Sequence, residues 1–159
     1  MKISIITLFP EVFEPILNSS ILKRAQQKGK VSFNIINLRD FGEGRHKVVD
    51  GRPYGGGAGM LLRADILAKS IKELTNKRRS STNCQIVLTS ASGKQYTQKQ
   101  AKKFSKLNHL IIVCGHYEGV DQRFIDKYVD KEISIGDYVL TGGEIPAMTI
   151  IDSIVRLIP

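Results

Sequence analysis

The chain has 159 residues, 42% of them hydrophobic, which is enough for one domain with a substantial core. No apolar run approaches the roughly 20 residues that a membrane-spanning helix needs, which excludes that class of protein. The formal net charge of +9 favours a polyanionic partner, although a solvated basic face would give the same composition. Cys84 and Cys114 have no metal-like spacing and are expected to be reduced core residues of a cytoplasmic protein.

Strands and helices alternate along the first half of the chain. β-branched apolar runs predict buried strands, and Ser, Thr or Asp before an amphipathic run predicts the start of a helix. In order, we expect a strand at Lys2–Phe9, a helical stretch opened by Pro10 and Glu11, a helix from about Ser20 to its stop at Gly29, a strand at Val31–Leu38, and a helix capped by Asp65 that runs to about Asn76. Residues 39–60 are polar, glycine-rich and aperiodic, which predicts a long loop with a functional role.

The second half continues the alternation. In order, we expect a polar loop at Lys77–Asn83, a strand at Gln85–Ser90, a basic helix capped by Thr97 that ends near Lys106, a strand at His109–Cys114, a short helix at Asp121–Tyr128, a strand at Lys131–Ile135, and an amphipathic helix at Glu144–Ile158. The whole pattern predicts an α/β fold with a mainly parallel sheet and helices on both faces, in one domain over residues 1–159.

Two basic groups are candidates for contact with RNA phosphates. One lies between Glu73 and Glu118, a stretch without acidic residues, and consists of Lys77, Arg78, Arg79, Lys94, Lys99, Lys102, Lys103 and Lys106. The other flanks the glycine-rich loop and consists of Arg45, His46, Lys47 and Arg52. The chain has no Trp, which disfavours simple stacking on single-stranded bases.

Three predicted strands end in glycine-containing turns. They are Ala91-Ser92-Gly93, Gly115–Gly119 and Gly136–Glu144. Ligands of α/β sheets bind beyond the carboxyl ends of the strands, and glycine lets a ligand approach the backbone closely. The turns therefore predict a site where main-chain groups read a planar adenine, with Ile135 and Leu140 as apolar walls.

Other site chemistries find less support. The Arg52–Gly59 segment resembles a phosphate cradle, but it lacks the Lys-Ser/Thr of a P-loop and the spacing of a dinucleotide fingerprint. The histidines form no metal triad: His109 is expected to be structural, His46 could touch phosphate, and His116 lies in a glycine turn. No motif for a Ser or Cys nucleophile is present.

Five blocks of the chain resemble, in order and spacing, the bacterial TrmD-type tRNA (guanine-N1)-methyltransferases. The blocks are Leu8–Phe13, Arg52–Met60, Gly115–Arg123, Ser134–Met148 and Ile151–Pro159. The resemblance implies a SPOUT fold with a deep C-terminal trefoil knot, which ordinary topology rules would not predict. It also implies a homodimer with two sites at the subunit interface, and methyl transfer from S-adenosylmethionine to N1 of the guanine just 3′ of the anticodon in tRNA.

The resemblance also implies the site residues. Arg156 matches the family arginine that engages the target guanine, so it is the candidate catalytic residue and a candidate RNA contact. Ala58 and Ala91 stand where the family usually has proline, which could loosen two turns. The S-adenosylmethionine site would involve Thr89, Ser90, Ala91, Gly115, Tyr117, Glu118, Ser134, Ile135, Gly136, Asp137, Tyr138, Val139, Leu140, Gly142, Gly143 and Pro146.

Members of the family continue into a linker, which carries an aspartate regarded as the general base, and into a small helical domain that grips tRNA. These 159 residues are expected to be the catalytic domain without them. Alone, they are then expected to bind S-adenosylmethionine but to methylate tRNA barely or not at all. Two alternatives stay open, namely a SPOUT enzyme that acts on ribosomal RNA and a non-enzymatic RNA-binding domain.

Overall fold

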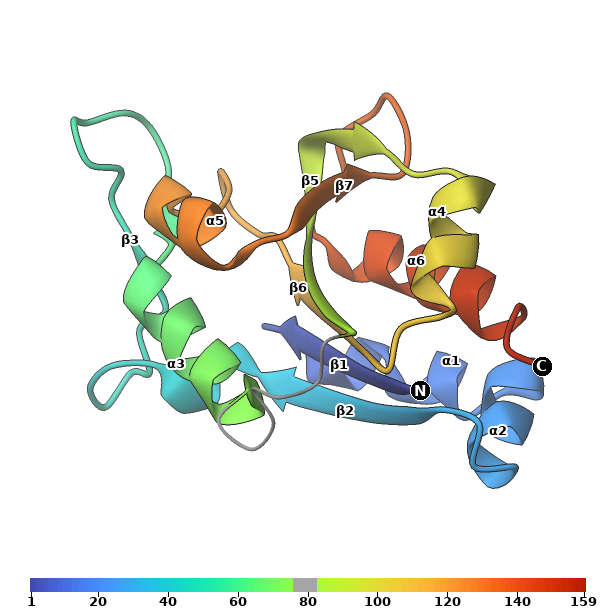
Figure 1. Cartoon of the computed structure of the whole chain (residues 1–159). Coiled ribbons are helices and arrows are strands. Elements are labelled where there is room, and N and C mark those ends of the chain that lie inside the picture. The colour runs from blue at the N-terminus through green and yellow to red at the C-terminus, as the bar shows by residue number, and fades with distance from the viewer. Residues whose placement is uncertain (76–82) are drawn as a thin grey trace.

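A five-stranded parallel sheet forms the centre of the computed structural model, which describes residues 1–75 and 83–159 (Figure 1). Its strand order is β2-β1-β6-β5-β7, and every neighbouring pair is parallel. The strands are β1 (Lys2–Thr7), β2 (Ser32–Asn37), β5 (Cys84–Gln95), β6 (His109–Cys114) and β7 (Lys131–Ser134). A separate antiparallel pair joins β3 (Asp50–Gly51) and β4 (Leu61–Leu62). The predicted α/β fold is confirmed.

Helices cover both faces of this sheet (Figure 1). One face carries α1 (Glu14–Leu17), α2 (Ser20–Gln27), α4 (Gln98–Phe104) and α6 (Glu144–Val155). The 3-10 turn η1 (Pro10–Val12) directly precedes α1. The other carries α3 (Ala64–Thr75), α5 (Gln122–Tyr128) and the 3-10 turn η2 (Leu38–Phe41). Side chains alternate across each strand, so Leu110 and Ile112 of β6 enter the first core, whereas Ile111 and Val113 enter the second. Burial on both faces explains why the central strand β6 is almost wholly apolar.

The largest difference from the predicted elements concerns β5. We expected this strand to end at Ser90 and to be followed by a turn, but it continues to Gln95, with a shift of register against β7 between Thr89 and Lys94. Gly93 permits this continuation, because a Cβ on it would lie 2.5 Å from the amide nitrogen of Ile133. Gly93 therefore allows close packing of β5 on β7 and does not form the predicted turn.

Smaller differences concern the helix ends and the long loop. Asp65 does not cap α3: it lies in the first turn, where its carboxylate accepts hydrogen bonds from Arg63 at 2.8 and 3.0 Å. Residues 39–60 are less irregular than predicted, since they contain part of η2, the turn joined by the Glu43–Val48 bridge, and β3. Helix α4 ends at Phe104 and α6 at Val155, both before the predicted ends. Of the predicted Lys77–Asn83 loop, residues 77–82 lie outside the described residues, as does Asn76.

Several local predictions are confirmed. Thr97 begins α4 with a capping box that pairs it reciprocally with Gln100, and Asp121 caps α5 through the amide of Arg123. Gly29 ends α2 with a φ of +65°, a conformation that favours glycine. Cys84 is half-buried and Cys114 buried, and neither forms a disulfide. Burial raises the pKa of both thiols, which keeps them protonated. The trefoil knot stays a prediction.

Candidate functional site

A pocket of about 530 Å³ lies at the carboxyl ends of β5, β6 and β7, which is a size typical of small-molecule sites. Its walls are the bulged part of β5, the turn after β6, and the long segment between β7 and α6. The three predicted glycine segments therefore meet at one place, although only those after β6 and β7 are turns, because Ala91-Ser92-Gly93 belongs to β5. The predicted cofactor residues that line the pocket are Thr89, Ser90, Ala91, Gly115, Tyr117, Glu118, Ser134, Ile135, Tyr138, Val139, Leu140, Gly142, Gly143 and Pro146.

The pocket wall also differs from the predicted set. Gly136 and Asp137 do not line it; Gly136 packs against the ring of Tyr138 instead. Other residues also line the pocket. Ser92, His116, Gly119 and Thr141 belong to the predicted glycine segments, so the sequence offered a signal for them. Leu88, Glu132 and Ile133 lie in strands β5 and β7, and Val120 directly follows Gly119. Gln122 and Ile125 come from α5, and nothing in the sequence pointed to them.

Buried Thr89 holds the ends of two strands to the start of α6. Its hydroxyl lies 3.3 Å from the carbonyl oxygens of Val113 and Gly143, and it accepts a hydrogen bond from the amide of Gly115 at 3.2 Å. The amide of Gly143 donates in turn to the carbonyl of Gly115 at 2.8 Å. The inner wall of the pocket is thus fixed by main-chain bonds, which gives a ligand a preformed surface.

Two glycines in this wall are required by close packing. A Cβ on Gly143 would overlap Thr89 Oγ1 and lie 2.5 Å from the amide nitrogen of Gly115. A Cβ on Gly115 would lie 2.6 Å from the carbonyl oxygen of Thr89. Unusual backbone angles are not the reason in this turn, because neither Gly142 nor Gly143 is among the residues with positive φ, and Gly143 has a φ of −84°.

Buried polar side chains pack beneath the turn that precedes α6, next to Gly142. Glu144, the first residue of α6, is only 9% exposed, and its Oε1 accepts a hydrogen bond from the hydroxyl of Thr7 at 2.7 Å. The start of a helix favours a negative charge there. His116 packs edge-on against Phe9 and Tyr117, and its buried Nδ1 has no hydrogen-bond partner within the described residues.

The outer rim of the pocket is apolar and open. Tyr138 is 56% exposed, Val139 84% and Leu140 37%, and Ile145 at the start of α6 is 57% exposed. Tyr117 adds an aromatic ring and has a φ of +58°, which is strained for a residue other than glycine. Adjacent exposed apolar side chains of this kind are typical of a surface that a ligand or another chain covers.

The glycine-rich loop is joined to the pocket. Gly59 packs so closely on Glu118 that a Cβ there would overlap its side chain, and the amide of Glu118 donates to the carbonyl of Met60 at 3.0 Å. Leu62 of β4 exchanges main-chain bonds with Gly119 and Asp121. The loop that was expected to approach phosphates therefore ends at the rim of the pocket.

The four basic residues around this loop have different surroundings. Arg45 and His46 are exposed on the turn between Glu43 and Val48, whereas Lys47 pairs with Asp40 at 3.0 Å. Arg52 is exposed and lines a second cavity, of about 670 Å³, between the β3–β4 pair and helices α3 and α5.

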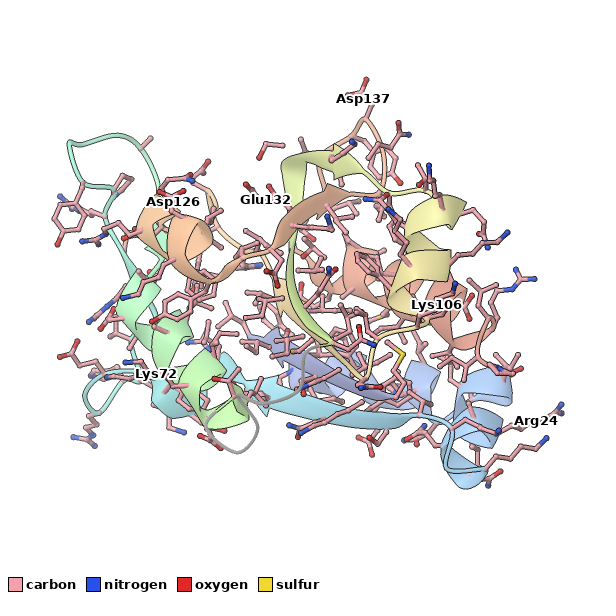
Figure 2. All side chains as sticks on the ribbon, viewed as in Figure 1. Arg24, Lys72, Lys106, Asp126, Glu132 and Asp137 are labelled. Atoms are coloured by element: carbon pink, nitrogen blue, oxygen red, sulfur yellow. The ribbon has the colours of Figure 1, made fainter. Side chains whose placement is uncertain are left out.

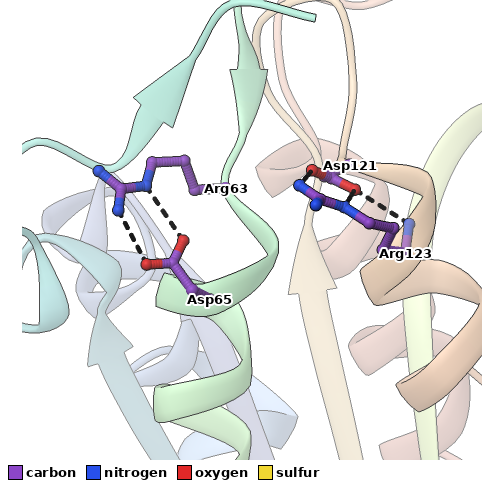
Figure 3. A network of polar contacts seen from close by, with 4 residues as sticks. All are labelled: Arg63, Asp65, Asp121 and Arg123. Atoms are coloured by element: carbon purple, nitrogen blue, oxygen red, sulfur yellow. Dashed lines mark hydrogen bonds and ion pairs between the residues drawn. The ribbon is translucent and has the colours of Figure 1, made fainter. Parts of the chain in front are cut away.

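Ion pairs fix the walls of that second cavity (Figure 3). Arg63 binds Asp65 and also reaches Glu43 at 2.6 Å, and Arg123 binds Asp121. Hydrogen bonds from the arginines lower the pKa of both Asp65 and Asp121. The guanidinium carbon of Arg123 also lies 4.5 Å from the centre of the Tyr54 ring, which links the glycine-rich loop to α5.

Arg156, the predicted catalytic residue, does not line the pocket of its own chain. It is exposed at the end of α6, whereas Gly143 and Pro146 at the start of that helix form the pocket wall. At about 1.5 Å per residue, the helix separates Arg156 from Gly143 by roughly 20 Å. One copy of the chain thus does not bring together the two predicted parts of the active site.

This fold and site define an α/β protein with a ligand pocket at the carboxyl ends of parallel strands. The model of the family described as tRNA (Guanine-1)-methyltransferase TrmD matches residues 1–159, and the chain belongs to this family. The predicted family is confirmed. Within the described residues, none of the helices is long and apolar enough to cross a membrane.

Curated relatives of this family align with the whole chain. The chain is 54% identical over 159 residues to a protein of Bacillus pumilus, 52% to one of Carboxydothermus hydrogenoformans and 49% to one of Bacillus subtilis. Each is named tRNA (guanine-N(1)-)-methyltransferase. The chain is covered completely and spans 64%, 61% and 65% of those relatives, respectively.

Proposed function

We propose that the chain binds S-adenosylmethionine and takes part in methyl transfer to N1 of the guanine just 3′ of the anticodon in tRNA. The observation that carries the proposal is the pocket formed by the bulged part of β5 and the turns after β6 and β7, in a chain of the TrmD family. The names of the relatives supply the base, the atom and the class of RNA. A cytoplasmic location, where tRNA is modified, belongs to the same proposal.

The residues present fit the proposed cofactor. Gly115 and Gly143 let their segments pack closely on Thr89, which fixes the main-chain wall against which an adenine would lie. Tyr138, Val139 and Leu140 offer apolar contact for the faces of the base. Glu118 supplies a carboxylate at the rim, where the cationic end of the molecule would be favoured.

Catalysis would then consist of positioning and of charge stabilisation. When bound, S-adenosylmethionine supplies the methyl group, so the chain has to hold N1 of the guanine in line with it. The Arg156 guanidinium would donate hydrogen bonds to the guanine oxygen as the N1 proton leaves. Asp152, which is exposed one turn before Arg156, is the nearest carboxylate on that helix; the resemblance assigns the proton acceptor to the linker beyond it.

A homodimer is part of the proposal, because the site is incomplete in one copy. The distance between Arg156 and the pocket is too large for an arginine side chain to cross, so a second copy has to supply this group. The apolar rim formed by Tyr138, Val139, Leu140 and Ile145 provides a surface on which that copy could pack.

Calorimetric titration with S-adenosylmethionine tests the pocket directly. We expect saturable binding, which Leu140→Asp weakens at least about tenfold by placing a charge on an apolar wall. Val48→Asp, at an equally exposed apolar position outside the pocket, serves as the control and should bind as the wild type does. Absence of binding to the wild-type chain would contradict the proposal.

Methyl transfer is measured separately, with labelled S-adenosylmethionine and either tRNA or ribosomal RNA. We expect the addition of a C-terminal region from one of the relatives to raise a weak or absent transfer to tRNA. Preferential labelling of ribosomal RNA would favour the alternative SPOUT enzyme. Rapid single-turnover methylation of tRNA by the 159 residues alone would overturn the assignment of the base to the linker and direct attention to Asp152.

A further inference from the structure

Positive charge gathers at the edge of the sheet where the parallel strands begin, opposite the pocket. Because α2, α4 and α6 run antiparallel to the strands, all three helices end at this edge. The exposed cations there form what we call the amino-edge surface: Arg24, Lys28, Lys30, Lys102, Lys103 and Lys106. Figure 2 places Arg24 and Lys106 on this side of the molecule, and Lys72 of α3 on the other.

Main-chain bonds make this surface continuous. The amino group of Met1 donates to the carbonyl of Lys30 at 2.9 Å, and the amide of Lys2 donates to the carbonyl of Asn108 at 2.8 Å. The side chain of Asn83 donates to the carbonyl of Lys106 at 2.7 Å. The segments after α2 and α4 are therefore held on either side of the start of β1, and α6 packs against both helices.

Helices α2 and α4 supply no acidic counterpart to this charge, and Asp152 is the acidic residue near the end of α6. In the described part of the chain, none of the six cations forms an ion pair. Helix α3 carries Lys69 and Lys72 but also two acidic residues. Cations in the last turn of a helix complement its dipole, but this effect fades beyond the helix end, where Lys30 and Lys106 lie.

We propose that the amino-edge surface binds RNA phosphates, and that it does so for the RNA whose guanine enters the pocket of a second copy. The inference rests on the proposed function. Arg156 lies at the same end of α6, and in the proposed dimer it acts at the partner's pocket. Whatever brings Arg156 there also brings the amino-edge surface of the same copy toward that RNA.

An RNA backbone fits this surface better than a membrane does. Exposed lysines and arginines can bind RNA phosphates without help from other groups. Stable membrane association also needs apolar side chains that insert between lipids. In the described residues, neither α4 nor the segment from Lys28 to Lys30 has an exposed large apolar side chain.

The experiment compares two double variants of the 159-residue chain that have the same net charge. Lys102→Gln/Lys106→Gln removes two cations of the amino-edge surface, and Lys69→Gln/Lys72→Gln removes two from α3. Affinity for an unmodified tRNA transcript is measured by fluorescence anisotropy over a series of salt concentrations. The slope of log affinity against log salt should fall by about 1.4 to 1.8 in the first variant, because each phosphate that is no longer neutralised lowers it by about 0.7 to 0.9. The α3 variant should keep the wild-type slope.

Equal slopes in the two variants would overturn the inference, because overall charge would then account for binding. So would a loss of binding by Lys102→Gln/Lys106→Gln to vesicles rich in phosphatidylserine together with unchanged binding to tRNA. Calorimetry with S-adenosylmethionine separates this failure from failure of the proposed function. Both variants should bind the cofactor as the wild type does, whereas a false proposed function would leave all three chains without cofactor binding.

Discussion

At the scale of single residues, close packing rather than backbone angle explains the glycines at positions 115 and 143 of the pocket wall. We expect Gly143→Ala to destabilise the fold by at least about 2 kcal/mol and to abolish cofactor binding, because its Cβ would overlap Thr89 Oγ1. Gly44→Ala is the matched control. Gly44 has a φ of +69° but no atom within 4 Å of an added Cβ, so only backbone strain of about 1 kcal/mol is expected. Urea denaturation and calorimetry measure both effects, and an equal loss of stability in the two variants would contradict the packing argument.

The buried carboxylate of Glu144 provides a second test at this scale. Thr7→Val removes the hydroxyl that donates to Glu144 and accepts from the amide of Phe9 at 3.0 Å. The loss of these two bonds, which leaves a buried carboxylate oxygen without that partner, should cost about 1 to 3 kcal/mol. Thr149→Val is the control, because the hydroxyl of Thr149 is exposed on the same helix and bonds only to the carbonyl of Ile145. Denaturation midpoints of the two variants give the comparison, and equal midpoints would show that the Thr7 bond contributes nothing particular.

At the scale of elements, local signals in the sequence were reliable where they concern one element. Apolar β-branched runs located all five strands of the main sheet, and Thr97 and Asp121 marked the starts of their helices. The continuation of β5 past Ser90 was missed, because it depends on pairing with β7, which lies some 40 residues further along the chain. The role of Gln122 and Ile125 in the pocket was missed for the same reason, since tertiary packing decides which face of α5 lies beside the turns.

The pair of Arg63 and Asp65 connects β4 to α3 and leads to a prediction about pH. Hydrogen bonds from Arg63 lower the pKa of Asp65, so the pair stabilises the folded state above the unfolded pKa of about 4, and this contribution disappears as the pH falls through the lower folded value. Because the carboxylate is exposed, we expect less than about 1 kcal/mol. Asp65→Asn should therefore lower the melting temperature at pH 7 but not at pH 2. Asp137→Asn, at an exposed position without an ion pair in the described residues, is the control.

At the scale of the whole molecule, the amphipathic pattern of α6 is not by itself an argument for the proposed dimer. Its apolar side chains Ile150, Ile151, Ile154 and Val155 are all buried in their own chain. The apolar excess lies instead at the start of α6 and in the preceding segment, at Ile145, Tyr138 and Val139. A helical pattern shows which side chains can be buried but not which of them a neighbouring layer of the same chain covers.

This relocation gives the last prediction. If a second copy packs on the rim of the pocket, Ile145→Asp should convert a micromolar dimer largely into monomer. The fold itself should be unaffected, because Ile145 is 57% exposed and an acidic residue is favoured in the first turn of a helix.

Sedimentation velocity measures the outcome, with Val48→Asp as the control at another exposed apolar position. Cofactor affinity is measured on the same samples, and tRNA methylation is measured on the same variants with a relative's C-terminal region appended. A composite site requires that methylation falls with the dimer, since Arg156 then has no pocket within reach. A wild-type chain that sediments as a monomer, or a monomeric Ile145→Asp variant with wild-type methylation, would show that Arg156 does not act at the partner's pocket.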